Sequence, residues 1–272
     1  CVIPFSRGRA RSRELDDLIS EVGRMVQSGV QEIILTGVNL GTYSSKSKNF
    51  LNLIEMISAF NGLKRIRISS IEPTTIPEAI FDWMADNSHP LMPYLHVPMQ
   101  SGSDEILNLM KRKYSLLEMS EFFERAVSKI PKVCIGTDLM VGFPGETNDH
   151  FEETCETFMN FPFSYCHVFT FSERKGTAAY RMQKQVRMDE RRKRSAHLRR
   201  LSSSKRMEFF KKHEGKIVEV LLENPKGNMI SGYTDNYVKV LLDKCDLTKP
   251  NKLINVKLIE TYPEFSKGIV LN

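Results

Sequence analysis

The sequence predicts an α/β fold: a partial parallel barrel of the (β/α)6 kind, followed by a small all-β domain with an oligonucleotide-binding-like (OB-like) barrel. Strand-like and helical runs alternate strictly up to Phe171, which indicates parallel strands joined by crossover helices. Polar loops follow successive strands, as in barrels whose active sites lie at the carboxyl ends of the strands. After Lys212 only short strand-like runs remain.

The alternation alone leaves a doubly wound sheet possible, and the apolar runs suit strands that are covered on both faces. The position of the polar loops favours the barrel. Five strands are visible before the all-β region, and the loop at Cys1 would follow a sixth strand that is absent or truncated. We therefore expect a barrel domain over residues 1–212 and a β domain over residues 213–272.

Composition is that of an ordinary globular protein. The 272 residues are 41% hydrophobic and 26% charged, which gives room for one large core and one small core. The five cysteines are scattered and form no C-x-x-C pair, so a reducing cytoplasm is the simpler location. No apolar run approaches the length needed to span a bilayer, and we expect no membrane association.

The first half of the barrel starts with a helix that Ser12 is placed to cap and that ends near Gly29. Its apolar residues recur at helical spacing. Pro77 opens a later helix. The expected elements are a strand at 32–36, a helix at 51–60, a strand at 65–69, a helix at 77–86 and a strand at 94–97.

The second half contains the clearest helix signals. Ser115 and Glu118 form a capping box at the start of one helix, and Thr147 is placed to cap another. The expected elements are helices at 104–110, 116–129 and 148–160, and strands at 133–138 and 165–171. In the β domain we expect strands at 216–223, 229–233, 237–242 and 252–260.

The basic excess is confined to one segment. The formal net charge is +6, and Arg181–Lys212 carries more than this excess. Such a helix is typical of a phosphate-facing surface, although a solvated helix face explains the charge equally well. The β domain is balanced in charge, so any RNA affinity there depends on its tyrosines. The predicted RNA-binding residues are Arg191, Arg192, Arg194, Arg199, Arg200, Tyr233 and Tyr237.

Several motifs carry a family resemblance. The segment that starts at Cys1, Cys-Val-Ile-Pro-Phe-Ser-Arg-Gly, resembles the stretch that begins at the third cysteine of the C-x-x-x-C-x-x-C loop in radical S-adenosylmethionine (SAM) methylthiotransferases. Five further segments are similar to motifs of that family, in the family's order. They are Leu35–Tyr43, Tyr94–Asp104, Met110–Tyr114, Thr137–Thr147 and Phe169–Thr177. The β domain resembles the family's TRAM domain, and the first two segments are most similar to the MtaB type.

The resemblance implies two cofactors and a set of ligands. A [4Fe-4S] cluster would be held by Cys1 and two upstream cysteines, leaving one iron open for SAM. A second [4Fe-4S] cluster would lie in an N-terminal domain that this sequence lacks. The implied SAM contacts are backbone near Gly37 and Asn39, polar groups of Gln100 and Ser101, packing from Ile3 and Gly142, and hydrogen bonds to Glu72 and Asp138.

Two histidines are interpreted without a metal. His96 and His167 have no second ligand at useful spacing in the sequence, so we expect them to be packed or hydrogen-bonded.

The resemblance also implies the reaction. SAM cleavage would give a deoxyadenosyl radical, followed by sulfur insertion and methyl transfer onto threonylcarbamoyladenosine beside the tRNA anticodon. The implied partners are the tRNA anticodon stem-loop and an electron donor such as a flavodoxin or ferredoxin. The alternatives are an isopentenyladenosine tRNA or ribosomal-protein methylthiotransferase, or a non-catalytic RNA-binding fragment. Without the N-terminal domain, we expect this chain alone to be inactive.

Overall fold

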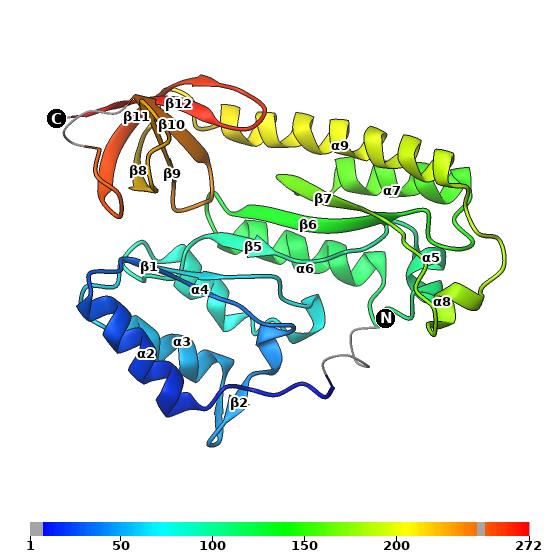
Figure 1. The fold of residues 1–272 in the computed structure, drawn as a ribbon, viewed down its shortest axis with the longest axis horizontal. Coiled ribbons are helices and arrows are strands. Elements are labelled where there is room, and N and C mark those ends of the chain that lie inside the picture. Colours follow the sequence, from blue (N-terminus) through cyan, green and yellow to red (C-terminus); the bar gives the residue numbers. More distant parts are fainter. Residues whose placement is uncertain (1–7, 244–247, 272) are drawn as a thin grey trace.

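A computed structural model describes residues 8–243 and 248–271, and Figure 1 shows their arrangement. The predicted α/β class is confirmed. Within these residues, five parallel strands lie side by side in two groups, a pair and a three-stranded sheet. A parallel bridge between Ile66 and Leu91 links the two groups. The strands are β1 (Glu32–Leu35), β4 (Arg65–Ile68), β5 (Tyr94–His96), β6 (Cys134–Val141) and β7 (Tyr165–Thr170).

Helices cover one face of these strands. Alternate strand residues such as Ile33, Ile66 and Leu95 are buried against them in one large core. Each such side chain contributes roughly 1.5–3 kcal/mol when it is fully buried. The helices are α2 (Leu15–Gln27), α3 (Phe50–Ser58), α4 (Ala79–Ala85), α5 (Asp104–Leu109), α6 (Leu116–Lys129), α7 (Asn148–Asn160), α8 (Ala178–Arg181) and α9 (Met188–Lys211). Among the described helices, none is both long and apolar enough to cross a membrane.

The capping predictions have mixed outcomes. The boxes at Ser115 and at Thr147 are both present. The expected cap at Ser12 is wrong: the Ser12 hydroxyl accepts a hydrogen bond from the Ser44 amide, at 3.0 Å. Instead, Ser45 caps α2 from outside the helix, because its Oγ accepts a hydrogen bond from the Leu15 amide at 3.1 Å. Ser45 belongs to a hairpin that was not predicted, formed by β2 (Ser44–Ser45) and β3 (Lys48–Asn49).

The C-terminal strands close into a small barrel in the order β10-β12-β11-β8-β9. Its core is a separate apolar cluster that includes Val220, Val240 and Val256. One strand was missed, β12, and another starts two residues later than expected because Tyr237 has a positive φ of 68°. The strands are β8 (Ile217–Leu222), β9 (Met229–Tyr233), β10 (Lys239–Asp243), β11 (Leu253–Thr261) and β12 (Ser266–Val270).

Two arginines of β4 fasten this barrel to the parallel strands. Arg65 and Arg67 are 2% and 1% exposed. Arg65 donates to the carbonyl oxygens of Tyr233 and Glu219 at 2.8 and 3.0 Å. Arg67 donates to those of Asp235 and Thr234, both at 2.7 Å. In Figure 1 the small barrel lies at the end of α9 and beyond the amino ends of β5 and β6. The predicted division at residues 212 and 213 falls between α9 and β8.

Candidate functional site

The face of the parallel strands that is turned away from the helices is polar. Successive strand residues point to opposite sides, so most strands send apolar side chains to the helices, and many of their polar or aromatic side chains point inward. The inward residues line a cavity of about 330 Å³, which we name the central pocket. Its lining is Ile34, Arg67, Ile68, Ser69, Ser70, Tyr94, His96, Asp138, His167, Phe169 and Tyr237.

A row of hydrogen-bonded side chains crosses the central pocket. His96 Nε2 lies 2.8 Å from Asp138 Oδ1, and the His96 and His167 rings have centroids 5.3 Å apart. On the other side, Tyr165 lies 3.5 Å from His96 Nδ1 and shares a 2.6 Å hydrogen bond with Tyr94. The prediction that His96 is hydrogen-bonded is confirmed. Sequence spacing did not reveal the cluster, because its members lie on three different strands.

Gly136 makes this row possible. A Cβ at this position would lie 2.6 Å from the Tyr165 hydroxyl and 2.8 Å from His96 Nδ1. Both distances are shorter than real carbon contacts, so only glycine lets these two side chains meet across β6. Burial lowers the pKa of His167, with a further lowering from His96, and this favours its neutral form.

The loops after β1 and β4 bring two predicted SAM contacts together. Thr75 Oγ1 donates to the side-chain oxygen of Asn39 at 2.8 Å and to the backbone oxygen of Glu72 at 3.0 Å. The Glu72 carboxylate forms an ion pair with Arg112 at 3.3 Å. Gly37 lies on the same loop as Asn39, and both residues line a hollow beside α2. Asn39 and Glu72 are therefore near neighbours at the carboxyl ends of two paired strands.

Gln100 and Ser101, although adjacent, differ in role. Gln100 has a positive φ of 74°, and its backbone amide donates to the Asp138 carbonyl at 2.7 Å. No described residue pairs with its carboxamide, which is free to bind a ligand. Ser101 is 2% exposed, and its hydroxyl is engaged by Thr154 and by the Ser103 amide. Its side chain shapes the loop, and this burial is inconsistent with the expected contact to a ribose.

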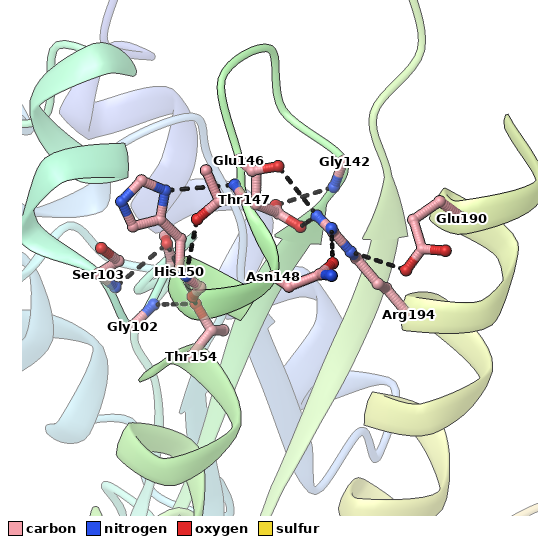
Figure 2. Close-up of polar contacts among 11 residues, drawn as sticks. Gly102, Ser103, Gly142, Glu146, Thr147, Asn148, His150, Thr154, Glu190 and Arg194 are labelled. Atoms are coloured by element: carbon pink, nitrogen blue, oxygen red, sulfur yellow. Dashed lines mark hydrogen bonds and ion pairs between the residues drawn. The ribbon is translucent and has the colours of Figure 1, made fainter. Parts of the chain in front are cut away.

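Gly142 opens a loop that an ion pair holds in shape (Figure 2). Its amide donates to the Glu146 carboxylate at 2.9 Å, and Arg194 of α9 binds the same carboxylate at 2.6 Å. Arg194 also donates to Asn148 Oδ1 at 2.7 Å. Burial raises the pKa of Glu146, and Arg194 opposes this shift. The φ of Gly142 is 76°, and a Cβ there would collide with the side chain of Arg191.

Two predicted RNA contacts are corrected by their burial. Arg191 is 2% exposed and Arg194 is 4% exposed. Arg191 donates to the Phe171 carbonyl at 3.1 Å and pairs with Glu173 at 3.0 Å. Both guanidinium groups therefore face the parallel strands and cannot reach tRNA phosphates. They fix α9 to the loops that follow β6 and β7.

The remaining predicted RNA contacts are accessible. Arg192, Arg199 and Arg200 are exposed on the outer side of α9. Tyr233 and Tyr237 are partly buried and stack on each other, with ring centroids 4.7 Å apart. Tyr237 also stacks on Tyr94 at 4.5 Å, so it forms the floor of the central pocket. Whether any of these residues binds RNA stays a prediction.

Cysteines offer a limited set of cluster ligands. Cys1 and Ile3 lie outside the described residues, and so does Cys245. Burial raises the pKa of the Cys134 and Cys166 thiols to about 12 and that of Cys155 to about 11. A cluster ligand must be a thiolate, and burial disfavours the thiolate form of these three cysteines in the cluster-free protein. This leaves the role of Cys1 as a prediction.

A family model decides the affiliation of the chain. The model described as the radical SAM superfamily matches residues 1–158, which include the parallel strands up to β6 and most of helix α7. The chain belongs to this superfamily.

Curated relatives of two kinds are similar to nearly the whole chain. The threonylcarbamoyladenosine tRNA methylthiotransferase MtaB of Bacillus subtilis is 35% identical over 98% of this chain and 61% of that protein. MtaB of Rickettsia prowazekii is 38% identical over 90% of this chain and 58% of that protein. The tRNA-2-methylthio-N(6)-dimethylallyladenosine synthase of Aquifex aeolicus is 36% identical over 100% of this chain and 62% of that protein. The chain thus spans less than two thirds of the length of these radical SAM relatives.

A solved structure shares the fold. Coproporphyrinogen III oxidase (HemN) from Escherichia coli, described as a radical SAM enzyme, has a TM-score of 0.56 at 14% sequence identity. The match covers 81% of this chain and 59% of that protein. At this identity the likeness concerns the fold only.

The residues present fit SAM. Gln100 combines an unpartnered carboxamide with a left-handed backbone at the carboxyl end of β5. Asn39 and Glu72 add amide and carboxylate groups at the carboxyl ends of β1 and β4. This donor and acceptor set suits a ligand with an amino group, a carboxylate and hydroxyls. That Gln100, Asn39 and Glu72 hold the cofactor in this radical SAM protein stays a prediction.

Proposed function

We propose that this chain is the radical SAM body of a tRNA methylthiotransferase that adds a methylthio group to threonylcarbamoyladenosine beside the anticodon. In this reading the parallel strands are the partial (β/α)6 barrel of that enzyme class, and the small barrel is its TRAM domain. The observation that carries the proposal is the 35% identity with the Bacillus subtilis MtaB over 98% of the chain. The polar central pocket and the accessible Gln100 support it.

The choice of nucleoside rests on two motifs. Thr36–Gly41 and Tyr94–Ser103 are most similar to the MtaB type. The second candidate is methylthiolation of isopentenyladenosine, which the 36% identity with the Aquifex aeolicus synthase favours. Overall identity does not separate the two kinds of relative, so the motifs decide our choice.

The chain's own residues would bind and orient the reactants. When bound, the cluster and SAM supply hydrogen-atom abstraction from a C–H bond of the modified adenine. Gln100, Asn39 and Glu72 would hold SAM at the carboxyl ends of the strands, because these side chains lie in the loops that follow β5, β1 and β4. Arg194 keeps the Gly142 loop in one shape through Glu146, without touching either reactant.

RNA would be bound outside the barrel. The exposed side chains of Arg192, Arg199 and Arg200 on α9 would contact phosphates of the anticodon stem-loop. A flavodoxin or ferredoxin would supply electrons, and the reaction would take place in the cytoplasm. A second cluster, which the family resemblance implies, would have to be provided by a part of the protein other than this chain.

A nucleoside assay tests the proposal. The full-length protein that contains this chain, reconstituted without oxygen, is incubated with SAM, a reductant and tRNA from a strain that lacks the gene. We expect the methylthio derivative of threonylcarbamoyladenosine in the digested tRNA, and none with the Cys1→Ala protein. Product on isopentenyladenosine alone would support the second candidate. A protein that binds tRNA but never forms deoxyadenosine would leave only the non-catalytic RNA-binding reading.

A further inference from the structure

Three polar side chains stand next to one another on consecutive strands of the central pocket. His96 belongs to β5, Asp138 to β6 and His167 to β7, and Asp138 and His167 are direct register partners. One ligand atom from each lies within 4.8 Å of the others. The assignment of SAM to the loops at the strand ends leaves His96 and His167 without a role.

The charge of this group limits what it can bind. Asp138 is still 18% exposed, and one of its oxygens contacts His96. The nearest cation in the pocket lining, Arg67, is committed to Glu32 at 3.0 Å and to two backbone carbonyls. An anionic ligand would therefore meet an uncompensated carboxylate. A neutral ligand with an N–H group would meet an acceptor.

His167 adds a second, adaptable partner. It is exposed to the pocket, and no described residue hydrogen-bonds either of its ring nitrogens. A neutral imidazole offers one donor and one acceptor. A ligand in the central pocket would thus find a hydrogen-bond acceptor at Asp138 and, beside it, a donor or acceptor at His167.

The pocket also offers flat apolar surfaces. Tyr237 forms its floor, held by stacking on Tyr94 and by Arg67 lying 5.0 Å from its ring centre. Phe169 lies two residues after His167 on β7, and it is 50% exposed. Aromatic faces of this kind stack on nucleobases. The opening of about 330 Å³ lies at the lower end of the range usual for ligand sites.

We infer that the central pocket binds the target adenine base of the RNA, with Asp138 accepting a hydrogen bond from the N–H group at N6 and His167 pairing with a second polar edge atom. N6 carries the N–H donor of adenine. His96 orients the Asp138 carboxylate. This inference rests on the proposed function and moves Asp138 from the SAM contacts to the substrate contacts.

The first test measures coupling between SAM cleavage and product. In the reconstituted full-length protein, the ratio of methylthio nucleoside to 5′-deoxyadenosine is compared for wild type, Asp138→Asn and His167→Phe. An amide retains the shape but presents N–H groups to the base. We expect the ratio to fall at least about tenfold in both variants, close to the effect of one lost buried hydrogen bond. The matched controls Asp82→Asn and His89→Asn, on or near α4 and outside the pocket, should stay within about twofold of wild type.

The second test measures RNA binding alone, without SAM cleavage. An anticodon stem-loop RNA with adenosine at the target position is compared with one that carries purine riboside, which lacks the N6 amino group. Wild type should bind the adenosine RNA at least about fivefold more tightly, and Asp138→Asn should lose this preference. Equal binding of both RNAs by wild type would overturn the inference, even if the enzyme is a methylthiotransferase. A wild type without any methylthio product would instead contradict the proposed function.

Two other results would also overturn the inference. Loss of SAM affinity in Asp138→Asn, with both products falling together, would return Asp138 to the SAM contacts. Stoichiometric binding of ZnCl2 that His167→Ala abolishes would make the three residues a divalent metal site, because His and Asp are common zinc ligands.

Discussion

Gln100 holds an unfavourable backbone conformation beside the central pocket. Its φ of 74° lies in the left-handed region, which costs a residue with a side chain roughly 1–2 kcal/mol. Both of its backbone groups are engaged, since its amide donates to Asp138 and its carbonyl accepts from Met140 at 2.8 Å. The backbone is thus fixed by β6, and the carboxamide, which pairs with no described residue, is displayed at a set position.

Replacing Gln100 separates these two properties. Gln100→Gly relieves the backbone strain, so the free energy of unfolding in urea should fall by less than about 1 kcal/mol or rise. SAM affinity, measured by equilibrium dialysis on the reconstituted full-length protein, should weaken by about 1–3 kcal/mol because a polar partner is lost. Lys132→Gly is the control, since Lys132 has a φ of 60° and lies outside the central pocket. SAM binding equal to that of wild type would remove Gln100 from the cofactor contacts.

Arg194 supports a second residue-scale prediction. Arg194→Met leaves the Glu146 carboxylate buried without its partner, which should cost roughly 3–5 kcal/mol of unfolding free energy at neutral pH. Burial raises the pKa of Glu146, and in Arg194→Met the guanidinium no longer opposes this shift, so the folded variant binds a proton at Glu146 more readily than the unfolded chain does. The loss should therefore be smaller at low pH and should grow as the pH rises through the pKa of the folded state.

Two variants check that assignment. Arg194→Met combined with Glu146→Gln should be more stable than Arg194→Met alone, because no buried charge remains. Lys193→Met, the exposed neighbour, should change the unfolding free energy by less than about 0.5 kcal/mol. A loss in Arg194→Met that is independent of pH would show that packing, and not the charge of Glu146, dominates.

At the scale of elements, α9 has two faces with different tasks. Arg191, Arg194 and Leu198 are buried against the strands and their loops, whereas Arg192 and Arg199 are seven residues apart on the exposed side. Changing Arg192 and Arg199 together to Gln should weaken binding to the anticodon stem-loop and flatten its dependence on salt. The plot of log affinity against log salt should lose about 0.7–0.9 in slope for each phosphate contact removed.

Exposed basic residues elsewhere give the matching control. Arg24→Gln with Lys64→Gln removes the same charge from outside α9. If both double variants reduce the slope equally, α9 acts only through the net charge of the protein. If neither does, α9 is a solvated surface, and recognition must come from the β domain.

Capping signals predicted helix ends well where the capping residue and its hydrogen-bond partner are close in the sequence. The helix Leu116–Lys129 was placed correctly because both members of its capping box lie within four residues. Ser12 failed as a cap because the acceptor that replaces it, Ser45, comes from a distant hairpin. Arg191 and Arg194 are three residues apart and so share a face of α9, but their inward direction depends on Glu146 and Glu173, which lie outside that helix.

Only part of the candidate site was predicted from the sequence. Motifs indicated Gln100 and Asp138, which a backbone hydrogen bond does bring together. They gave no reason to join His96 and His167, which are far apart in the sequence and meet only through the pairing of β5, β6 and β7. Strand alternation could have revealed part of the polar inner face, since His96 lies between Leu95 and Val97 and His167 lies between Cys166 and Val168.

At the scale of the whole molecule, His213 joins three parts of the chain. Its Nδ1 lies 3.0 Å from the Phe209 carbonyl, and its Nε2 lies 2.8 Å from Asn236 Nδ2, which also donates to the Lys132 carbonyl. This network requires a neutral ring that donates from Nδ1 and accepts at Nε2. Burial lowers the pKa of His213, aided by Lys216 and Lys132 and opposed by Phe209 and Asp235.

A lowered histidine pKa makes stability depend on pH. The unfolded chain binds the proton more readily than the folded one, so the full stability is present above a pH of about 6.5 and is lost as the pH falls below it. His213→Gln, which can supply one donor and one acceptor, should reduce the loss in unfolding free energy between about pH 7.5 and about pH 5.5. His197→Gln, on the exposed side of α9, should leave the pH profile unchanged. Identical profiles for wild type and His213→Gln would contradict this assignment.

The small β barrel is attached to β4 through its own main-chain atoms. Arg65 and Arg67 bind four backbone carbonyls, at Glu219, Tyr233, Thr234 and Asp235. Every residue type provides such an oxygen. The surface side chains of the barrel can therefore diverge in evolution without loss of its attachment to β4.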